Sequence, residues 1–208
     1  LGSFGVYQQK AVGAYQEGIT GTYLYSSSES GQTSYWPMEN PSGTTVSDIV
    51  GSNSGTASGT TVVSGRYGNS RSFNGISDYV TIPNSIDTPI KTGSFTLSSW
   101  FKASSFSTNM TIFQRGIVSS GGLYYGMGLY ASSTAITFAR NVASSSAQIS
   151  YTYNFLTNVW YHVAATYNDS TGAVAIYLNG VPVSTGTLST NDVAYHGSYD
   201  QGYTVGAM

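Results

Sequence analysis

Short stretches rich in β-branched and aromatic residues recur along most of the chain, and clusters of Gly, Ser and Asn separate them. Strict alternation of apolar and polar residues, or a short apolar run, indicates a β-strand, whereas an amphipathic helix needs apolar positions three or four residues apart. Almost nowhere does such a helical period persist over several turns. Many short strands with turn residues between them are typical of a sandwich, so the pattern predicts an all-β fold, a two-sheet antiparallel jelly-roll sandwich.

The expected strands are the runs richest in Val, Ile, Thr, Tyr, Phe and Trp. They span residues 79–83, 95–103, 111–115, 124–131, 135–140, 148–153, 160–167 and 174–178. The last run is followed by Asn179-Gly180 and a further apolar stretch. Because Asn and Gly tolerate positive φ angles, this dipeptide predicts a hairpin with a type I′ turn.

The tryptophans fall within or beside these expected strands. In the run 95–103, Phe95 and Leu97 share one side and Trp100 is out of phase with them, as in a broad central strand of a sheet. Large aromatic side chains usually occupy the interior of a sandwich. We therefore expect Trp36, Trp100 and Trp160 to anchor the core, with a sugar-stacking role as the alternative.

Residues 1–34 differ from the rest of the chain. A weak helical pattern is interrupted by Gly13 and Gly18, the stretch 19–26 resembles a strand, and the Ser-rich residues 26–34 have the composition of a linker. We expect an N-terminal extension over residues 1–34 and a folded domain over residues 35–208. Because the chain begins with Leu1, we also expect a processed form or a fragment.

Composition removes several classes of function. Charged residues make up 8% of the chain, against about 25% in ordinary soluble domains, and the net charge is −2. This balance does not favour binding to nucleic acid or to an anionic membrane surface. Cysteine is absent, which excludes disulfides and thiolate metal sites, and no apolar run approaches the length of a membrane span. A neutral surface rich in hydroxyl groups suits a secreted or cell-surface protein.

Several motifs occur in a fixed order from Tyr35 onward and carry a resemblance to a known family. They are YWPMEN with its Gly/Asn-rich loop (35–59), GRYGNSRSFNGISDYVTIPNS (65–85), SFTLSSWFKAS (94–104), NVWYHVAATYNDSTGAVAIYLNGVPV (158–183) and YTVGAM (203–208). In these motifs the chain resembles the LamG-like jelly rolls of the concanavalin A-like lectin/glucanase superfamily. The resemblance implies the fold far more specifically than it implies a ligand.

The resemblance also implies one further strand after the counterpart of YTVGAM, which would close the sandwich beside the first strand. The sequence stops at Met208, so we expect either that it is a fragment or that another segment takes that place. The strand-like stretch of the extension could donate it, with Ile19, Gly21, Tyr23 and Tyr25 as the inserted positions. Donated within one chain, it would close its own sheet; donated to the next molecule, it would build a head-to-tail filament.

Acidic residues offer little for catalysis. Glucanases of the resembled superfamily carry two Glu and one Asp alternating on one strand, and no expected strand here carries two acidic residues. His162 lies in a strand where the family usually has a histidine, which favours a structural, hydrogen-bonded role. We expect a protein that is not an enzyme.

Two other kinds of site are suggested by short motifs. Glu39, Asn40, Asp48 and Asn53 cluster in a loop-rich region where the resembled family often holds a structural calcium, although Asp and Asn also build turns without any metal. The sequons at Asn109 and Asn168 predict N-glycosylation. We expect Asp78 and Asp169 to be turn residues.

Two functions remain open at this point. The first is a non-enzymatic structural or adhesive protein outside the cell, the subunit of a pilus-like surface filament whose partner is another copy of itself. The second is a carbohydrate-binding or adhesion module, with or without calcium, that binds glycans through loops 119–125 or 195–203.

Overall fold

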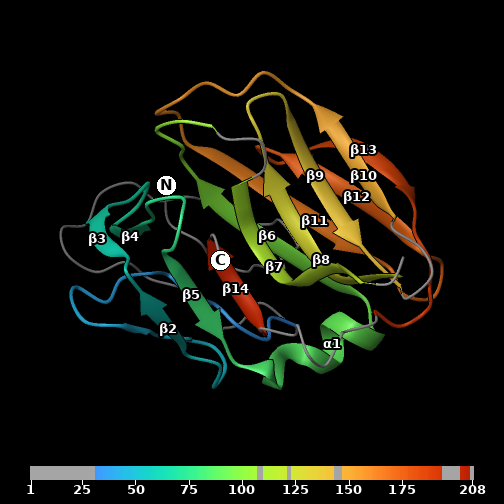
Figure 1. Ribbon diagram of the computed structural model, residues 1–208, viewed down its shortest axis with the longest axis horizontal. Helices are drawn as coiled ribbons and strands as arrows, with labels where there is room; N and C mark the ends of the chain where they lie inside the picture. The colour runs from blue at the N-terminus through green and yellow to red at the C-terminus, as the bar shows by residue number, and fades with distance from the viewer. Residues whose placement is uncertain (1–30, 107–109, 121–122, 143–146, 194–201, 207–208) are drawn as a thin grey trace.

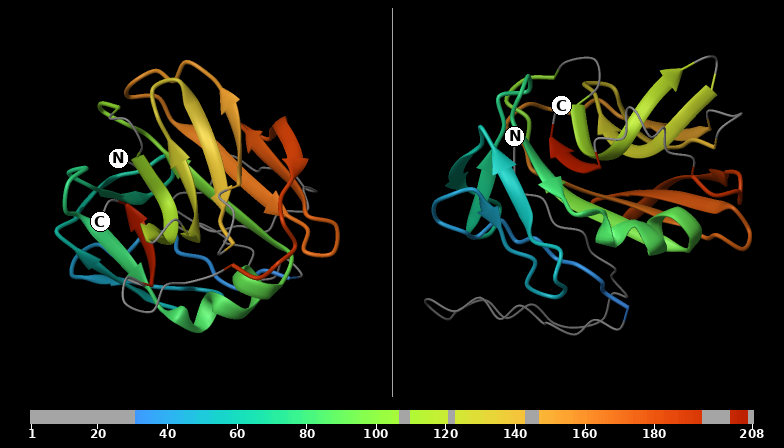
Figure 2. Two further views of the ribbon diagram at one scale, coloured as in Figure 1. Left: turned by 45° about the vertical axis from the view of Figure 1, so that its right-hand side comes forward. Right: turned by 60° about the horizontal axis from the view of Figure 1, so that its bottom comes forward.

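The computed structural model describes residues 31–106, 110–120, 123–142, 147–193 and 202–206. Two antiparallel sheets form two layers, which are seen edge-on in the right-hand view of Figure 2. The all-β sandwich expected from the sequence is therefore confirmed. None of the helices in the described residues has the length and apolar character that a membrane span requires.

The larger sheet has eight strands and faces the viewer in Figure 1. Across the sheet these are β1 (Thr45–Val46), β2 (Gly55–Ser58), β5 (Tyr79–Ile82), β14 (Tyr203–Gly206), β7 (Met110–Ser120), β8 (Leu123–Ala131), β9 (Ala135–Arg140) and β10 (Gln148–Thr152). Strands from both ends of the described chain meet here, because β14 pairs with both β5 and β7. The C-terminal YTVG stretch is thus built into the middle of the sheet.

The smaller sheet has four strands in the order β13 (Val181–Thr187), β12 (Ala173–Leu178), β11 (Tyr161–Tyr167) and β6 (Phe95–Phe101). A separate hairpin joins β3 (Thr61–Ser64) to β4 (Asn69–Ser72), and a turn of 3-10 helix, η1 (Asn84–Ile86), leads into α1 (Asp87–Thr92). The short helix was not expected from the sequence. Ile86 of η1 and Ile90 of α1 pack into the core.

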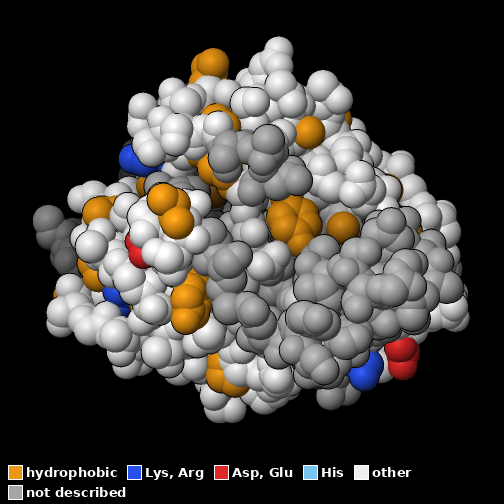
Figure 3. Space-filling model, viewed as in Figure 1, with side chains coloured by type: hydrophobic (Ala, Val, Ile, Leu, Met, Phe, Trp, Pro, Cys, Tyr) orange, Lys and Arg blue, Asp and Glu red, His pale blue; other side chains and the backbone are white. Residues whose placement is uncertain are grey.

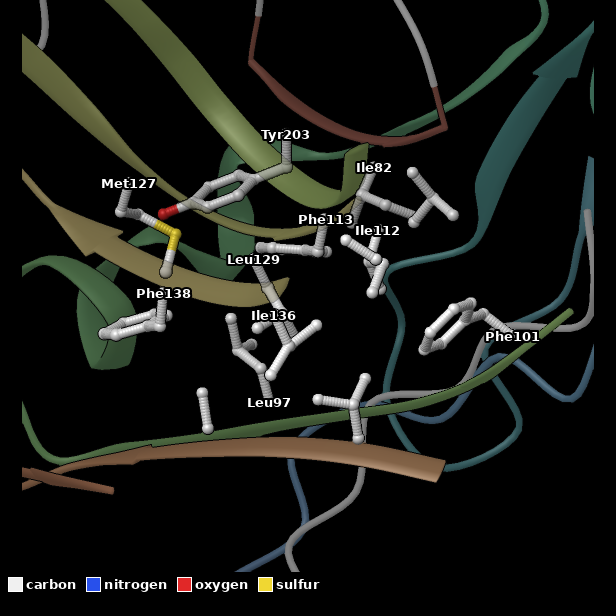
Figure 4. Close-up of a cluster of buried hydrophobic side chains, with 14 of the residues drawn as sticks. Ile82, Leu97, Phe101, Ile112, Phe113, Met127, Leu129, Ile136, Phe138 and Tyr203 are labelled. Carbon is white, nitrogen blue, oxygen red and sulfur yellow. The ribbon is translucent and has the colours of Figure 1, made fainter. Parts of the chain in front are cut away.

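The core lies between the two sheets. Leu97 and Phe101 of β6 point toward Phe113, Leu129 and other side chains of the larger sheet (Figure 4). Each of these side chains is at least 97% buried. Full burial of a large apolar side chain contributes roughly 1.5–3 kcal/mol, so this alternating inward set is what fixes the register of both sheets.

Most expected strands are confirmed with shifts of a few residues at their ends. The Asn179-Gly180 hairpin is also confirmed, since these residues have φ angles of 50° and 82° and Leu178 pairs with Val181. Among the described strands β6 pairs with β11, so its expected central position stays a prediction.

The outer face of the larger sheet carries a row of small hydroxyl and amide side chains. Thr56, Thr81, Thr204 and Gln114 form a continuous row across four strands. Some of these groups bond within the sheet itself, as Thr81 Oγ1 does with the Thr56 carbonyl at 3.2 Å. The Lys, Arg, Asp and Glu side chains that are visible in Figure 3 lie toward the outline of the molecule.

Candidate functional site

A group of aromatic and cationic side chains lies on the outer face of the smaller sheet. Phe95, Leu97 and Phe101 of β6 point into the core, so strand alternation turns Trp100 outward. The same alternation turns His162 of β11 outward, and it is the direct cross-strand partner of Trp100. The two rings lie 5.3 Å apart between centroids, and both are half-buried.

The turn between β3 and β4 brings two further side chains to Trp100. Residues 65–68 read Gly-Arg-Tyr-Gly, and the Gly65 N–H donates to the Gly68 carbonyl at 2.8 Å. Gly68 has a φ angle of 57°, and a Cβ atom there would collide with the carboxylate of Glu39. Glycine is therefore required at position 68, and the tight turn exposes Arg66 and Tyr67 at its tip.

Arg66, Tyr67 and Trp100 form one stacked unit. The Tyr67 ring meets the Trp100 ring edge-on, with a centroid distance of 6.1 Å and an interplanar angle of 83°. The Arg66 guanidinium carbon lies 4.9 Å from the Tyr67 centroid and 5.6 Å from the Trp100 centroid. These contacts orient the rings, while Tyr67 remains 42% exposed.

A second cation–aromatic pair extends the group at the end of the same two strands. Lys102 Nζ lies 5.1 Å from the centroid of the Trp160 ring. Lys102 follows Phe101 and Trp160 precedes Tyr161, and Phe101 and Tyr161 are cross-strand partners. Val159 and Val181, which lie at this end of the sheet, are also exposed. The six side chains are referred to as the Trp100 patch. They are Arg66, Tyr67, Trp100, Lys102, Trp160 and His162.

Burial favours the neutral form of the histidine of the patch. Burial lowers the pKa of the His162 imidazole below its usual value of 6.5. The backbone of His162 is bonded to Asn179, but no described group forms a hydrogen bond with its ring nitrogens. A neutral imidazole offers one donor and one acceptor, so this ring can bond a hydroxyl group in either direction.

The three tryptophans do not all have the expected role. Trp36 is a core anchor, 1% exposed, and its Nε1 donates to the Asn53 carbonyl at 2.8 Å. The expectation of a core position is wrong for Trp100 and Trp160, which lie on the outside of the sheet. The expectation of a hydrogen-bonded structural His162 is also wrong for its ring, which packs against Trp100.

The region in which calcium was expected is built around Asp48. Its Oδ1 accepts hydrogen bonds from the backbone N–H groups of Tyr35, Val50 and Gly51 at 2.9–3.1 Å, and its Oδ2 accepts one from Asn53 at 3.1 Å. Burial alone would raise the pKa of Asp48, but these bonds outweigh it and hold the pKa below its usual value. The carboxylate thus stabilises residues 47–54, called the Asp48 loop.

The other three expected calcium ligands have separate partners. Glu39 Oε2 accepts from the Asn69 N–H at 3.0 Å, Asn40 bonds Ser47, and Asn53 bonds Ser34 and Ser85. No group of three or more acidic or histidine side chains suited to a metal occurs in the described residues. Asp48 and Asn53 meet, whereas Glu39 and Asn40 bond other groups, so the four expected ligands do not converge on one point. Calcium binding stays a prediction.

The sequence of residues 73–201 matches the family model of the concanavalin A-like lectins and glucanases. The chain belongs to this superfamily. The resemblance carried by the LamG-like motifs is therefore confirmed. A comparison with curated protein sequences finds no match.

Solved structures with the concanavalin A-like fold share little sequence with the chain. Domain 4 of the extracellular arabinanase AbnA from Geobacillus stearothermophilus, in complex with arabinotriose, is 20% identical, with 76% of each chain covered and a TM-score of 0.56. A Trypanosoma rangeli sialidase variant is 15% identical over 81% of this chain and 26% of its own, with a TM-score of 0.55. A leech intramolecular trans-sialidase is 15% identical over 57% of this chain, with a TM-score of 0.47. The chain spans only 19% of that enzyme.

One of the two expected glycosylation sites and the expected donor strand are not placed by the structure. Asn109 and the donor-strand positions Ile19, Gly21, Tyr23 and Tyr25 lie outside the described residues. Asn168 is exposed in the turn between β11 and β12, as expected. Its Oδ1 accepts from the N–H groups of Ser170 and Thr171, and no hydrogen bond of its amide nitrogen is formed within the described residues. Glycosylation itself stays a prediction.

The loops expected to bind sugar are only partly described. The side chains of residues 119–125 and the structure of residues 194–201 lie outside the described part of the chain. Tyr203 does not belong to an exposed loop, because it is fully buried in the core beside Phe113. Asp78 closes the turn that begins at Asn74, and Asp169 lies in the turn after β11, so both are turn residues as expected.

Proposed function

We propose that the protein is a non-catalytic carbohydrate-binding module of a secreted or cell-surface protein, and that the Trp100 patch binds the glycan. The observation that supports this most is the composition of the patch. Aromatic rings, a neutral imidazole and two cations converge on one outer face, although the chain has only seven Lys and Arg residues in total.

A sugar ring has the chemical character that such a patch recognises. One face of the ring presents C–H groups, which pack against Trp and Tyr rings, and its rim presents hydroxyl groups. Aromatic side chains provide a large contact area at low entropic cost, and Trp, Tyr and Arg dominate the energies of most binding surfaces. Trp100 and Trp160 would stack on the sugar, while His162, Arg66 and Lys102 would bond its hydroxyl groups.

Membership of the concanavalin A-like superfamily supports a carbohydrate ligand in general. The arabinanase domain with the same fold was solved with arabinotriose, which makes arabinose oligosaccharides a sensible first probe. The low sequence identity means that the position of the site rests on the Trp100 patch itself.

The experiment is a glycan screen with the full chain, including arabinotriose, followed by calorimetry on the best ligand. Trp100→Ala should weaken that affinity at least tenfold, because about 1.4 kcal/mol of stacking corresponds to a factor of ten. Thr137→Ala, on the outer face of the larger sheet, is the matched control and should leave the affinity unchanged. An unchanged affinity of Trp100→Ala, or no bound glycan at all, would contradict the proposal.

A further inference from the structure

The polar atoms that the Trp100 patch leaves without a partner are mostly hydrogen-bond donors. The indole N–H groups of Trp100 and Trp160 donate to no described residue, whereas the indole N–H of Trp36 in the core does. The Arg66 guanidinium and the Lys102 ammonium also form no hydrogen bond with a described residue. These groups can only donate, because neither an indole nitrogen nor a cationic side chain offers an acceptor.

Acceptors are scarce in the same patch. The Tyr67 hydroxyl and one ring nitrogen of a neutral His162 can accept, but each of these side chains also carries a donor. The carboxylate of Glu39 lies close to Gly68, yet its Oε2 already accepts from the Asn69 N–H at 3.0 Å. A sugar hydroxyl both donates and accepts, whereas a carboxylate or a sulfate only accepts, so the excess of donors matches an anionic ligand.

Neither cation of the patch is neutralised by an acidic side chain. Arg66 and Lys102 form no ion pair with a described residue, in contrast to Arg140, which lies 3.9 Å from Asp169. The other three arginines of the chain are each at most 4% exposed, so a ligand cannot reach them. The patch therefore presents unpaired positive charge on a chain whose net charge is −2.

The aromatic rings hold both cations in place before any ligand binds. The Arg66 guanidinium carbon lies 4.9 Å from the Tyr67 centroid, and Lys102 Nζ lies 5.1 Å from the Trp160 centroid. Side chains that are already ordered lose less entropy when they bind. The N–H groups of a guanidinium lie in its plane, so contact between its face and a ring leaves these donors for a ligand.

The two cations accompany successive outward positions of the smaller sheet. Trp100 and Lys102 are two residues apart on β6, which corresponds to roughly 6.6 Å along the strand. Arg66 contacts the ring of Trp100, and Lys102 contacts the ring of Trp160. Each tryptophan thus has a cation of its own. An oligosaccharide along the strand would place an acidic group of successive sugars beside each cation.

We propose that the Trp100 patch selects glycans whose sugars carry an anionic group, a carboxylate or a sulfate ester, over neutral glycans. This inference rests on the proposed glycan-binding function and names the class of glycan. Arg66 and Lys102 bind the anionic groups, while the tryptophan rings stack on the C–H faces of the sugars. An exposed ion pair strengthens binding by up to about fivefold, so two pairs should favour an acidic glycan about tenfold at low salt.

The test measures, by calorimetry on the full chain, pairs of oligosaccharides that differ only in charge. Trigalacturonic acid is compared with its methyl ester, and 6-sulfated galactotriose with galactotriose, so that the two pairs distinguish a carboxylate from a sulfate. At about 20 mM NaCl an acidic member should bind about tenfold more tightly than its neutral counterpart. At about 0.5 M NaCl the preference should fall below about twofold, because salt screens exposed charges.

The outcomes separate this inference from the proposed function. Equal or tighter binding of the neutral member in both pairs would overturn selection of anionic glycans and leave the glycan-binding function intact. A chain that binds no member of either pair, and no glycan in the wider screen, would overturn both. Trp100→Ala should weaken binding of the acidic and the neutral member alike, because it removes a stacking surface that both use.

A matched pair of variants tests the cation itself. Lys102→Met keeps an apolar stem beside Trp160 but removes the charge, so it should lower the preference for the acidic member at least twofold and leave the neutral affinity unchanged. Lys91→Met on α1 removes the same charge outside the patch and should leave the preference unchanged. An equal loss of preference in both variants, or an unchanged preference in Lys102→Met, would overturn the assignment of the anionic group to the patch.

Discussion

The Trp100 patch and the Asp48 loop belong to the same sandwich but use their polar atoms in opposite ways. The carboxylate of Asp48 accepts four backbone N–H groups, and the neighbouring Asn53 is bonded on both sides. In the patch, the cations of Arg66 and Lys102 rest on aromatic rings, and the imidazole of His162 has no hydrogen-bond partner among the described residues. A polar cluster that satisfies itself builds structure, whereas one that does not retains capacity for a ligand.

The largest effect expected from this difference is on stability. Asp48→Ala leaves several backbone N–H groups of the loop without an acceptor, which should lower the free energy of unfolding by about 2–3 kcal/mol. Affinity for the glycan should not change. Urea denaturation and calorimetry measure the two quantities on the same sample. Asp192→Ala, an exposed carboxylate elsewhere, should change stability by no more than about 0.5 kcal/mol. If Asp48→Ala also weakened glycan binding, the Asp48 loop and the Trp100 patch would have to be regarded as one binding site.

At the patch we expect a smaller effect, which changes glycan affinity and leaves stability nearly constant. Arg66→Ala removes a guanidinium that lies over Tyr67 and Trp100 and should weaken glycan affinity about fivefold, the equivalent of about 1 kcal/mol for an exposed cation–aromatic contact. Stability should stay nearly constant because the side chain is exposed. Arg66→Lys should recover only part of the affinity, since an ammonium group lacks the planar fork. If Arg66→Ala kept the full glycan affinity, Arg66 and the turn of residues 65–68 would not belong to the binding site.

The strands and the core of the sandwich could be predicted because their signals are local. Alternating apolar positions identify β5, β6, β9 and β12, and the Asn-Gly dipeptide after β12 fixes its hairpin. Trp36 could be assigned to the core because large aromatic side chains usually occupy the interior of a sandwich.

The patch could not be predicted because it forms only when distant segments meet. Tyr67 reaches Trp100 through the β3–β4 turn, and His162 reaches it through the pairing of β11 with β6. One signal was present, namely that Trp100 is out of phase with Phe95 and Leu97. The hydrogen bonds of the Asp48 loop could not be predicted for a different reason, because a sequence of oxygen donors does not show how many backbone N–H groups they accept.

A modest dependence of stability on pH should distinguish the contribution of His162 from that of Asp48. Its pKa is lowered in the folded protein, so the unfolded chain binds more protons below about pH 6.5, and stability should fall as the pH drops through that value. The pKa of Asp48 is also lowered, but its contribution is lost only below about pH 4. Thermal unfolding between pH 7.5 and 5 should therefore depend less on pH in His162→Gln than in the original chain. His196→Gln is the control, and an equal flattening in both variants would contradict the assignment.

The smallest expected effect concerns calcium at the Asp48 loop. A cation that binds only the folded state stabilises it by about 2.7 kcal/mol at a hundred times its dissociation constant, which raises the melting temperature of a domain this size by several degrees. Because the carboxylate of Asp48 is already surrounded by N–H donors, millimolar calcium, and equally its removal with a chelator, should shift the melting temperature by less than about 1 °C. Magnesium at the same concentration controls for ionic strength. A calcium-specific shift of several degrees would mean that the loop opens to admit the ion. The loop would then be a binding region like the patch, and the contrast between the two would fail.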